Sequence, residues 1–218
     1  METKIALYSD VVCPWCYIGK KRMEDAIFLW KQSHPEDEIH VEWRAFQLNP
    51  DLPPEGEDRE LHMSRKFGSS DRIKPMVQRV ADIAEAEGLP FATEQKGRQP
   101  NTFLLHALIR KAEEKGKAFE LADIFFRNFF AQHKDLTDAD VIRESLKEAG
   151  LDPEVLERVK NDRELLDEIR ETEFQGKRSG VSGVPFFVFN EKYAVSGAQE
   201  SALFLQVFDR LKTESLTV

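Results

Sequence analysis

The sequence contains few cysteines, only two in 218 residues. A small secreted domain held together by disulfide bonds carries many more for its length, so this chain is not a disulfide framework. The two cysteines, Cys13 and Cys16, stand near the start of the chain with two residues between them. Their pairing therefore has to be explained by local chemistry rather than by a network of cross-links.

Long apolar runs and an excess of positive charge are also missing. No apolar run reaches the roughly 18 residues that a membrane span requires, and the opening METKIALYSD lacks the basic and apolar segments of a secretory signal. Lys and Arg number 31 against 40 Asp and Glu, a net charge of −9, which opposes binding to nucleic acid or anionic lipid. We therefore expect a cytoplasmic protein with neither nucleic acid nor membrane among its partners.

The start of the chain has the pattern of a strand, a helix and a second strand. Residues 4–8 predict a short buried strand. Apolar residues then recur with helical spacing from Met23 to Trp30, and residues 39–45 alternate between apolar and polar, which is the period of a strand. The two cysteines lie where the first strand of this βαβ unit passes into the helix.

A loop rich in Pro, Gly and acidic residues at 49–60 precedes a helical region. Its apolar stripes have helical spacing, and the five phenylalanines from Phe119 to Phe130 are best explained as filling a helical core. The end of the chain returns to strands, with an apolar run at 186–190 typical of a buried strand, a hairpin partner at 193–197 and a closing helix. The order βαβ, helices, ββα predicts an α/β protein.

The spacing of the cysteines suits reversible chemistry. At a helix start Cys13 and Cys16 lie on one face, close enough for the ~4.4–6.8 Å Cα separation of a disulfide. Pro14 suits the first helical turn because its missing N–H would have no partner there. Cys13 then faces the positive end of the helix dipole, which favours the thiolate over the thiol. We predict Cys13 as the attacking sulfur and Cys16, more buried, as the resolving sulfur.

A zinc site and a permanent disulfide are weaker interpretations of the pair. His34 and His40 have a spacing found in zinc sites, but the intervening helix, at ~1.5 Å per residue, carries His34 roughly 25 Å from the cysteines. A permanent structural disulfide across a two-residue loop would constrain almost no chain entropy. We therefore expect no metal site and interpret the CPWC stretch as a reversible redox couple.

Four stretches of the chain resemble the DsbA-like branch of the thioredoxin superfamily, and within it the FrnE-like proteins: YSDVVCPWCYIGKKR, FQLNPDLP, PNTFLLHALIRKA and GVSGVPFFVFNEKYAVSGAQ. The resemblance spans essentially the whole chain and implies a thioredoxin fold interrupted by a mostly helical insertion domain. It places the two parts of the thioredoxin-fold domain at 1–48 and 178–218, and the insertion domain at 58–177. It further implies thiol–disulfide exchange on protein or small-molecule thiols.

The resemblance also assigns a role to Val184 and Pro185. Pro185 aligns with the cis-proline that the family has beside the dithiol, whereas X–Pro bonds in general are cis only ~5–6% of the time. A cis bond would turn the backbone N–H and C=O of Val184 toward the cysteines, where an extended substrate would pair with them. This role is a hypothesis that a trans bond, or a bond far from Cys13, would remove.

Pro14 and Trp15, between the cysteines, depart from the Pro-His pair of the strongly oxidising DsbA proteins. Trp15 offers an indole N–H and an apolar face but no cationic imidazole, so we expect a less oxidising couple and leave open whether it acts as oxidase, reductase or isomerase. The chain also lacks the second cysteine pair that some FrnE-like proteins carry near the C-terminus. We expect no bound cofactor, with glutathione as a candidate co-substrate.

Asp10 and His106 each have two interpretations. Asp10, three residues before Cys13, could be a buried acid that tunes the thiol or carries its proton, although an Asp there more often caps a turn or helix. His106 could border a cleft, but a hydrogen-bonded structural histidine is the stronger interpretation. The basic residues 20–22 are interpreted as a solvated helix face.

Two further functions compete with a redox enzyme. Kappa-class glutathione transferases and hydroxychromene-carboxylate isomerases resemble this chain in layout and use glutathione, but they typically have Ser where Cys13 stands and no resolving cysteine. A non-catalytic, chaperone-like binding protein would use an apolar cleft between the domains and keep the cysteines incidentally. Having both cysteines favours dithiol–disulfide exchange. The natural substrate, the reducing partner and the oligomeric state are left open.

Overall fold

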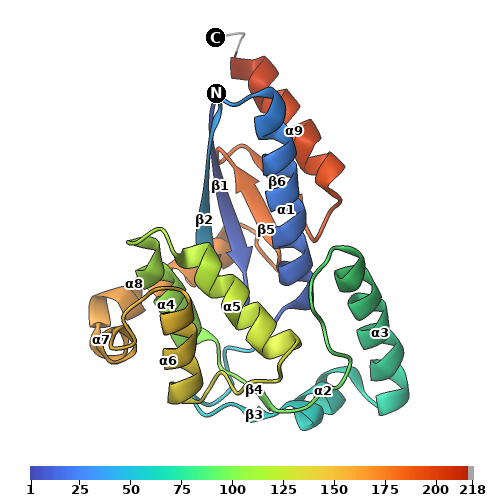
Figure 1. The fold of residues 1–218 in the computed structure, drawn as a ribbon, viewed down its shortest axis with the longest axis vertical. Helices are drawn as coiled ribbons and strands as arrows, with labels where there is room; N and C mark the ends of the chain where they lie inside the picture. The colour runs from blue at the N-terminus through green and yellow to red at the C-terminus, as the bar shows by residue number, and fades with distance from the viewer. Residues whose placement is uncertain (216–218) are drawn as a thin grey trace.

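The computed structural model describes residues 1–215 as a four-stranded sheet with helices packed on it and a helical region at one end of it (Figure 1). In chain order the elements are β1 (Glu2–Ser9), α1 (Pro14–Ser33), β2 (Glu38–Ala45), β3 (Glu57–Asp58), α2 (Arg59–Phe67), α3 (Ser70–Ala86), β4 (Arg98–Gln99), α4 (Phe103–Glu113), α5 (Ala118–Phe130), α6 (Ala139–Glu148), α7 (Val155–Asn161), α8 (Arg163–Arg178), β5 (Phe186–Phe189), β6 (Tyr193–Ser196) and α9 (Ser201–Ser215).

The central sheet has the strand order β2-β1-β5-β6. Strand β1 runs parallel to β2, with Leu7 opposite Trp43, and antiparallel to β5, with Leu7 opposite Phe187. Strands β5 and β6 form the antiparallel hairpin that the sequence predicts. The βαβ and ββα parts therefore share one sheet although the helical region lies between them in the chain. This confirms the α/β fold with an interrupting helical region.

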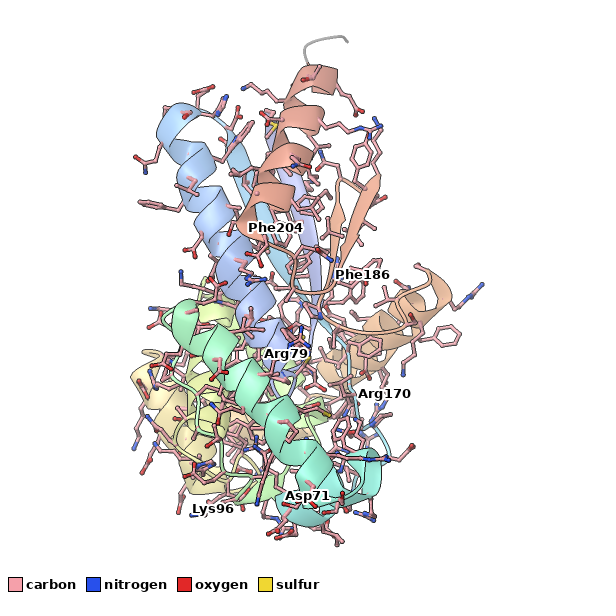
Figure 2. The ribbon with its side chains drawn as sticks, turned by 90° about the vertical axis from the view of Figure 1, so that its right-hand side faces the viewer. Asp71, Arg79, Lys96, Arg170, Phe186 and Phe204 are labelled. Carbon is pink, nitrogen blue, oxygen red and sulfur yellow. The ribbon has the colours of Figure 1, made fainter. Side chains whose placement is uncertain are left out.

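The strands are fully buried on one face only, so the prediction of buried strands at 4–8 and 186–190 holds for that face. Every second residue of β1 and of β5 is buried, and the residues between them are half-buried or exposed. Helices α1 and α9 pack side by side over the buried face (Figures 1 and 2). There Phe204 of α9 contacts Phe187 edge to face, with ring centroids 4.9 Å apart. An apolar run predicts burial but does not show whether helices cover one face of the sheet or both.

The helical region runs from β3 to Arg178 at the end of α8. It contains a short ribbon in which β3 pairs antiparallel with β4, and this ribbon was not predicted because two residues carry no detectable alternation. None of the helices in the described part of the chain is long and apolar enough to cross a lipid bilayer. The assignment of 58–177 as a separate domain stays a prediction.

Lys20 joins the helical region to α1, and its interpretation as a solvated residue is wrong. Its side chain is 1% exposed. The ammonium lies 2.6 Å from Glu24 on the same helix and 2.8 Å from Asp123 on α5, and it sits over the ring of Phe119 at 5.4 Å. The long methylene stem of a lysine is easily buried when its charge finds carboxylates at its end. A periodicity argument treats every Lys as polar and therefore misses this case.

The phenylalanines of α5 form a core that continues into α1, as the sequence predicts. Tyr17 of α1 stacks on Phe126 with ring centroids 4.9 Å apart, and Phe129 meets Phe130 edge to face at the same distance. Phe125, Phe126, Phe129 and Phe130 are at most 2% exposed. The N-terminal end of α1, where the cysteines are, is thus held between the sheet and the helical region (Figure 1).

Candidate active site

The turn from β1 into α1 positions the two cysteines. The backbone N–H of Cys13 donates to the carbonyl of Asp10 at 3.0 Å, which closes the turn. Cys13 is the N-cap residue of α1, with an extended backbone (φ −94°, ψ 114°), and Pro14 is the first helical residue. No acidic side chain lies in the first turn of this 20-residue helix. The Cys13 sulfur therefore stands at a helix N-terminus whose partial positive charge favours an anion.

Cys13 opens onto a cavity, although it is only 4% exposed. Its thiol lies 3.5 Å from the carbonyl oxygen of Val184, to which it donates. Trp15, which is 37% exposed, lines the cavity next to it. Cys16 is fully buried and does not line this cavity. A substrate in the cavity therefore reaches the first sulfur and not the second.

The loop bearing Val184 and Pro185 is held against α1 by a close helix contact. The Val184–Pro185 peptide bond is cis, as the family resemblance implied. Gly19 faces this loop, and a Cβ at that position would lie 2.8 Å from Cγ of Pro185, closer than atoms of this kind approach. Glycine is thus required there for the loop to reach Cys13. An isolated Gly inside a helical pattern is a signal that sequence analysis could have used.

The environment of Cys16 disfavours its thiolate. Burial raises the pKa of the Cys16 thiol well above its usual value, and the neighbouring Cys13 raises that pKa further. The Ser9 hydroxyl and the N–H of Asp10 lower it, and this N–H lies 3.5 Å from the Cys16 sulfur. The hydroxyl of Ser9 is buried and makes no well-aligned hydrogen bond in the part of the chain that the structure describes. Cys16 is therefore a protonated thiol with two weak donors beside it.

Asp10 is fully buried behind the cysteines and faces a histidine. Oδ2 accepts a hydrogen bond from the N–H of Leu48 at 2.7 Å, and Oδ1 lies 3.6 Å from Nε2 of His106. The indole of Trp43 donates to Nδ1 of His106 at 3.2 Å. Since an indole N–H only donates, we assign the proton of the neutral imidazole to Nε2, on the side of Asp10. His106 is therefore a buried, hydrogen-bonded residue and does not border the cavity.

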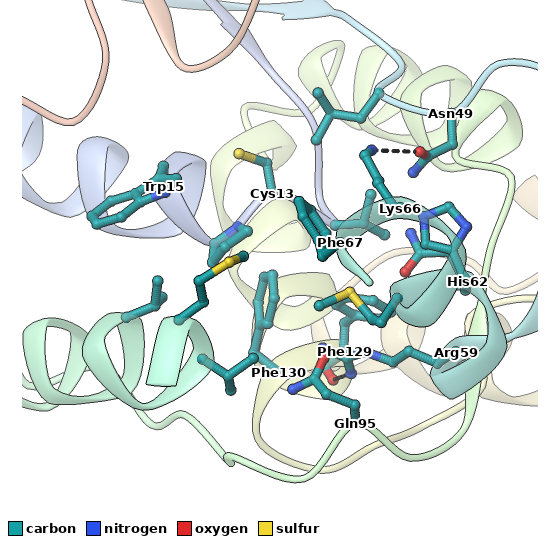
Figure 3. Close-up of a pocket in the computed structure, with 18 of the residues that line it drawn as sticks. Cys13, Trp15, Asn49, Arg59, His62, Lys66, Phe67, Gln95, Phe129 and Phe130 are labelled. Atoms are coloured by element: carbon teal, nitrogen blue, oxygen red, sulfur yellow. Dashed lines mark hydrogen bonds between the residues drawn. The ribbon is translucent and has the colours of Figure 1, made fainter. Parts of the chain in front are cut away.

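The cavity in front of Cys13 has a volume of about 670 Å³ and is formed mainly by apolar side chains (Figure 3). The sheet part of the protein contributes the cysteine turn, Leu48 and the Val184 loop, and the rest of the lining comes from the helical region. From α2, α3 and α5 come Arg59, His62, Met63, Lys66, Phe67, Met76, Val77, Arg79, Val80, Phe129 and Phe130. Phe129 and Phe130 thus belong to the core and also line the cavity, which the core interpretation alone did not predict.

The structure brings together the residues that the sequence singled out around the dithiol and separates those of the zinc alternative. Cys13, Pro14, Trp15 and Val184 all line the cavity. His34 lies beyond the last residue of α1, at the opposite end of the helix from Cys13. Among residues 1–215 no group of three or more His, Cys, Asp or Glu side chains is arranged to hold a metal ion. The cavity residues of α2 and α3 were missed because nothing in their sequence marks them.

The chain is similar to a family of known proteins, to a protein of Bacillus subtilis and to a solved structure. The family described as DSBA-like thioredoxin domain matches residues 4–209. The protein YwbO of Bacillus subtilis is 24% identical over 213 residues, which cover 97% of this chain and 99% of YwbO. The crystal structure of the probable DsbA oxidoreductase SCO1869 from Streptomyces coelicolor is 33% identical with a TM-score of 0.87, and the match covers 97% of this chain and 91% of SCO1869.

A more distant structure shares the fold. The cytosolic disulfide reductase DsbM from Pseudomonas aeruginosa, solved with GSH, has a TM-score of 0.67 at 16% identity. The match covers 96% of this chain and 99% of DsbM. At this identity the likeness concerns the fold alone.

Proposed function

We propose that this chain, which belongs to the DSBA-like thioredoxin domain family, is a thiol–disulfide oxidoreductase with Cys13 as its attacking sulfur and Cys16 as its resolving sulfur. One observation carries the proposal. Cys13 stands at a helix N-terminus on an open cavity, while Cys16 is sealed one turn further along the same helix. This is the asymmetry that a two-step exchange requires, because one sulfur has to be accessible to the substrate and the other has to stay buried until the resolving step.

The proposed reaction moves two electrons from the dithiol to a disulfide. The Cys13 thiolate attacks one sulfur of the substrate, a bond forms between them, and the substrate disulfide breaks to release one thiolate. Cys16 then loses its proton and attacks the Cys13 sulfur, which forms the Cys13–Cys16 disulfide and releases the second thiolate. The protein is oxidised and the substrate is reduced. The reverse sequence forms a disulfide in a substrate dithiol.

The neighbouring residues have supporting roles in this proposal. The backbone of Val184, turned toward Cys13 before the cis Pro185, offers its polar groups to an extended substrate. Pro14 begins the helix, and Trp15 provides an apolar wall at the mouth of the cavity. Asp10 is the candidate acceptor for the proton that Cys16 loses, since it is the fully buried carboxylate of the turn that carries both cysteines.

The proposal extends to the physiological partners. Glutathione is a candidate co-substrate that would return the oxidised dithiol to its reduced form. The likeness to DsbM, which was solved with GSH, supports this at the level of the fold. The cytoplasmic location, the FrnE-like branch and the direction of the reaction stay predictions.

The test compares Cys13→Ser with Cys16→Ser in the reduction of insulin, with dithiothreitol regenerating the protein. Cys13→Ser should lose all turnover above the uncatalysed rate because no attacking sulfur is left. Cys16→Ser should also turn over poorly but should accumulate a mixed disulfide through Cys13, visible by mass spectrometry. Wild-type turnover in Cys13→Ser would refute the proposal.

The same variants separate the two competing functions. A chaperone-like binding protein would suppress aggregation of an unfolded client equally well with Cys13→Ser, and would show no disulfide turnover in the wild type. A glutathione-dependent isomerase would retain its reaction in Cys16→Ser, because that chemistry needs no resolving cysteine. Loss of exchange in both variants, together with the trapped mixed disulfide, supports the dithiol mechanism over both alternatives.

A further inference from the structure

The cavity in front of Cys13 differs in charge from the rest of the protein. The chain as a whole has 40 acidic against 31 basic residues. The cavity lining, taken over residues 1–215, contains Arg59, Lys66, Arg79 and His62 but no Asp or Glu. Apolar side chains make up most of the remainder. Such a surface selects against cations and provides fixed positive charge to an anion.

Arg59 is the buried member of this cationic group. The residue is 4% exposed, and its guanidinium lies 4.0 Å from the ring centroid of Phe129. Nη1 donates to the carbonyl of Phe129 at 3.1 Å. Within residues 1–215 no carboxylate lies at ion-pair distance from it, in contrast to Arg65 on the same helix, which pairs with Glu57. A guanidinium has five N–H donors, so most of its capacity is free for a ligand.

No carboxylate in the described chain offsets the cost of burying Arg59, whose contacts are instead the ring and the carbonyl of Phe129. Burial lowers the pKa of Arg59 to about 10, which still leaves it charged at neutral pH. Proteins rarely bury a charge without a partner of opposite sign, because desolvation is expensive.

Among the other basic side chains of the cavity, Lys66 donates to Asn49 at 2.8 Å. His62 contacts Glu57 at 2.6 Å, and burial lowers the pKa of His62, which disfavours the charged imidazole. Arg79, the remaining cation of the lining, is exposed to water, so Arg59 is the buried cation without a carboxylate partner and the one best placed to receive an anionic group.

Figure 3 shows Cys13 and Arg59 at different parts of the cavity, with Phe67 between them in this view and Phe129 beside Arg59. We propose that the cavity binds a small, largely apolar disulfide or thiol that carries an anionic group, with its sulfur at Cys13 and its anion at Arg59. The anionic group is a carboxylate or a group of similar shape, because the planar guanidinium donates to both oxygens at once. This proposal rests on the redox function proposed above and specifies its substrate class.

Glutathione fits the cavity less well than such a compound. It carries two carboxylates, an ammonium group and two peptide groups, and a lining without Asp or Glu among residues 1–215 offers its ammonium group no carboxylate. An aromatic carboxylate joined to a sulfur buries its ring against the phenylalanines and keeps only one charge to be matched. The cavity is thus better suited to an aryl or alkyl acid than to a tripeptide.

Two symmetrical aryl disulfides test the proposal: dithiobis(nitrobenzoate), which is anionic, and dithiodipyridine, which is neutral. With either probe, Cys13 attacks one sulfur and releases one aryl thiolate, and Cys16 then closes the protein disulfide and releases the second. The probe gains the two electrons that the dithiol loses. The second-order rate constant is measured by stopped flow on the reduced protein from the absorbance of the released thiolate. The ratio of the anionic to the neutral rate constant is the quantity of interest.

We expect Arg59→Gln to lower the rate constant for the anionic probe about tenfold or more, as expected for loss of a charge-assisted hydrogen bond. The rate constant for the neutral probe should change by less than about twofold. Arg59→Lys, which keeps the charge but not the planar fork, should lie between wild type and Arg59→Gln. Arg72→Gln is the matched control, because it removes the same charge from an exposed position of α3 outside the cavity lining. Its ratio should equal that of the wild type.

The outcomes distinguish this inference from the proposed function. An unchanged ratio in Arg59→Gln, or an equal change in Arg72→Gln, overturns the anion site while leaving the redox function intact. Reaction of neither probe with Cys13 would instead contradict the redox function.

A wild-type measurement covers the case in which Arg59→Gln does not fold. Naphthoate should slow alkylation of Cys13 by iodoacetamide, whereas neutral naphthamide should slow it much less. Equal protection by the two compounds would also overturn the anion site.

Discussion

The protein buries one aspartate at each end of α1, and the two carboxylates have different partners. Asp37, just beyond the C-terminal end, contacts the N-terminal amine of Met1, lies 2.6 Å from Lys212 and accepts a hydrogen bond from Trp30 at 3.0 Å. Asp10, just before the N-terminal end, is contacted by the backbone N–H groups of Leu48 and Val12 and by a neutral histidine. Both carboxylates are fully buried. Only Asp37 has cationic partners at ion-pair distance that are charged at neutral pH.

The difference separates the two ends of α1. We call the C-terminal end, where Asp37 is paired, the structural end, and the N-terminal end, where the cysteines and Asp10 lie, the chemical end. At Asp37 burial raises the pKa, but the hydrogen bonds from Lys212, the N-terminal amine and Trp30 outweigh it and lower that pKa to about 2. The charge is thus matched and contributes to stability. Around Asp10, the Ser9 hydroxyl and Nε2 of His106 are buried without well-aligned partners in the described residues. Spare hydrogen-bonding capacity beside a reactive sulfur is available for a proton or a negative charge that appears during reaction.

The largest expected effect is on stability at the structural end. Asp37→Asn should lower the free energy of unfolding by about 3 kcal/mol, because Lys212 and the N-terminal amine lose the charge that compensates them. Urea denaturation at neutral pH measures this change. Insulin reduction well below the melting temperature should be unaffected, since Asp37 lies at the other end of the helix from Cys13. A loss of turnover in a folded Asp37→Asn protein would remove the distinction between the two ends.

Lowering the pH should reproduce part of the loss in the free energy of unfolding that we expect for Asp37→Asn. The Asp37 pKa of about 2 in the folded state lies below its usual value of 3.8, so the stabilisation is present above pH 4 and is lost as pH falls toward 2. The shift corresponds to about 2 kcal/mol. The stability difference between wild type and Asp37→Asn should therefore shrink between pH 5 and about 2.5. A difference that stays constant over this range would place the stabilisation elsewhere.

A smaller effect, on rate, is expected at the chemical end. If the Asp10 carboxylate takes the proton of Cys16 as proposed, Asp10→Asn should slow the resolving step at least about tenfold at neutral pH, because an amide cannot accept a proton from the buried thiol. Pre-steady-state measurements separate this step from the attack by Cys13, which should keep its rate. His106→Gln is a control for disturbed packing, since it alters the neighbour of Asp10 but retains the carboxylate. Equal slowing in both variants would favour a structural role for Asp10.

The smallest effect is expected from Ser9→Ala. The hydroxyl of Ser9 lowers the pKa of Cys16, so its removal should raise that pKa further. One weak hydrogen bond corresponds to about a threefold change in the thiolate population. The pH dependence of Cys16 alkylation in the Cys13→Ser background isolates this thiol and should shift to higher pH. A shift to lower pH would show that Ser9 accepts from the thiol rather than donating to it.

Much of the fold was predictable because its signals are local. The α1 stripe from Met23 to Trp30 and the alternation in β2 depend on near neighbours in the chain, and both elements are found close to the predicted bounds. The failures concern what covers each element. Lys20 is buried because Asp123 and Phe119, about a hundred residues away, lie against it. Phe186 and Val188 are half-buried because helices pack on the other face of the sheet.

The sequence by itself determined the chemistry at the helix start. Two cysteines with two residues between them, followed by a helical stripe, specify a dithiol at a helix N-terminus, since this geometry depends on a few consecutive residues. The aspartate three residues earlier was also visible as a candidate buried acid.

Only the tertiary structure decided what the dithiol faces. The Val184 carbonyl that meets Cys13 is 171 residues away in the chain, and the Phe129 carbonyl that holds Arg59 is 70 residues from it. The first contact follows from the pairing of β5 with β1 and the second from the approach of α2 to α5, and no local pattern records either of them. The reactive group is therefore encoded locally, whereas the cavity that selects its substrate exists only in the folded chain.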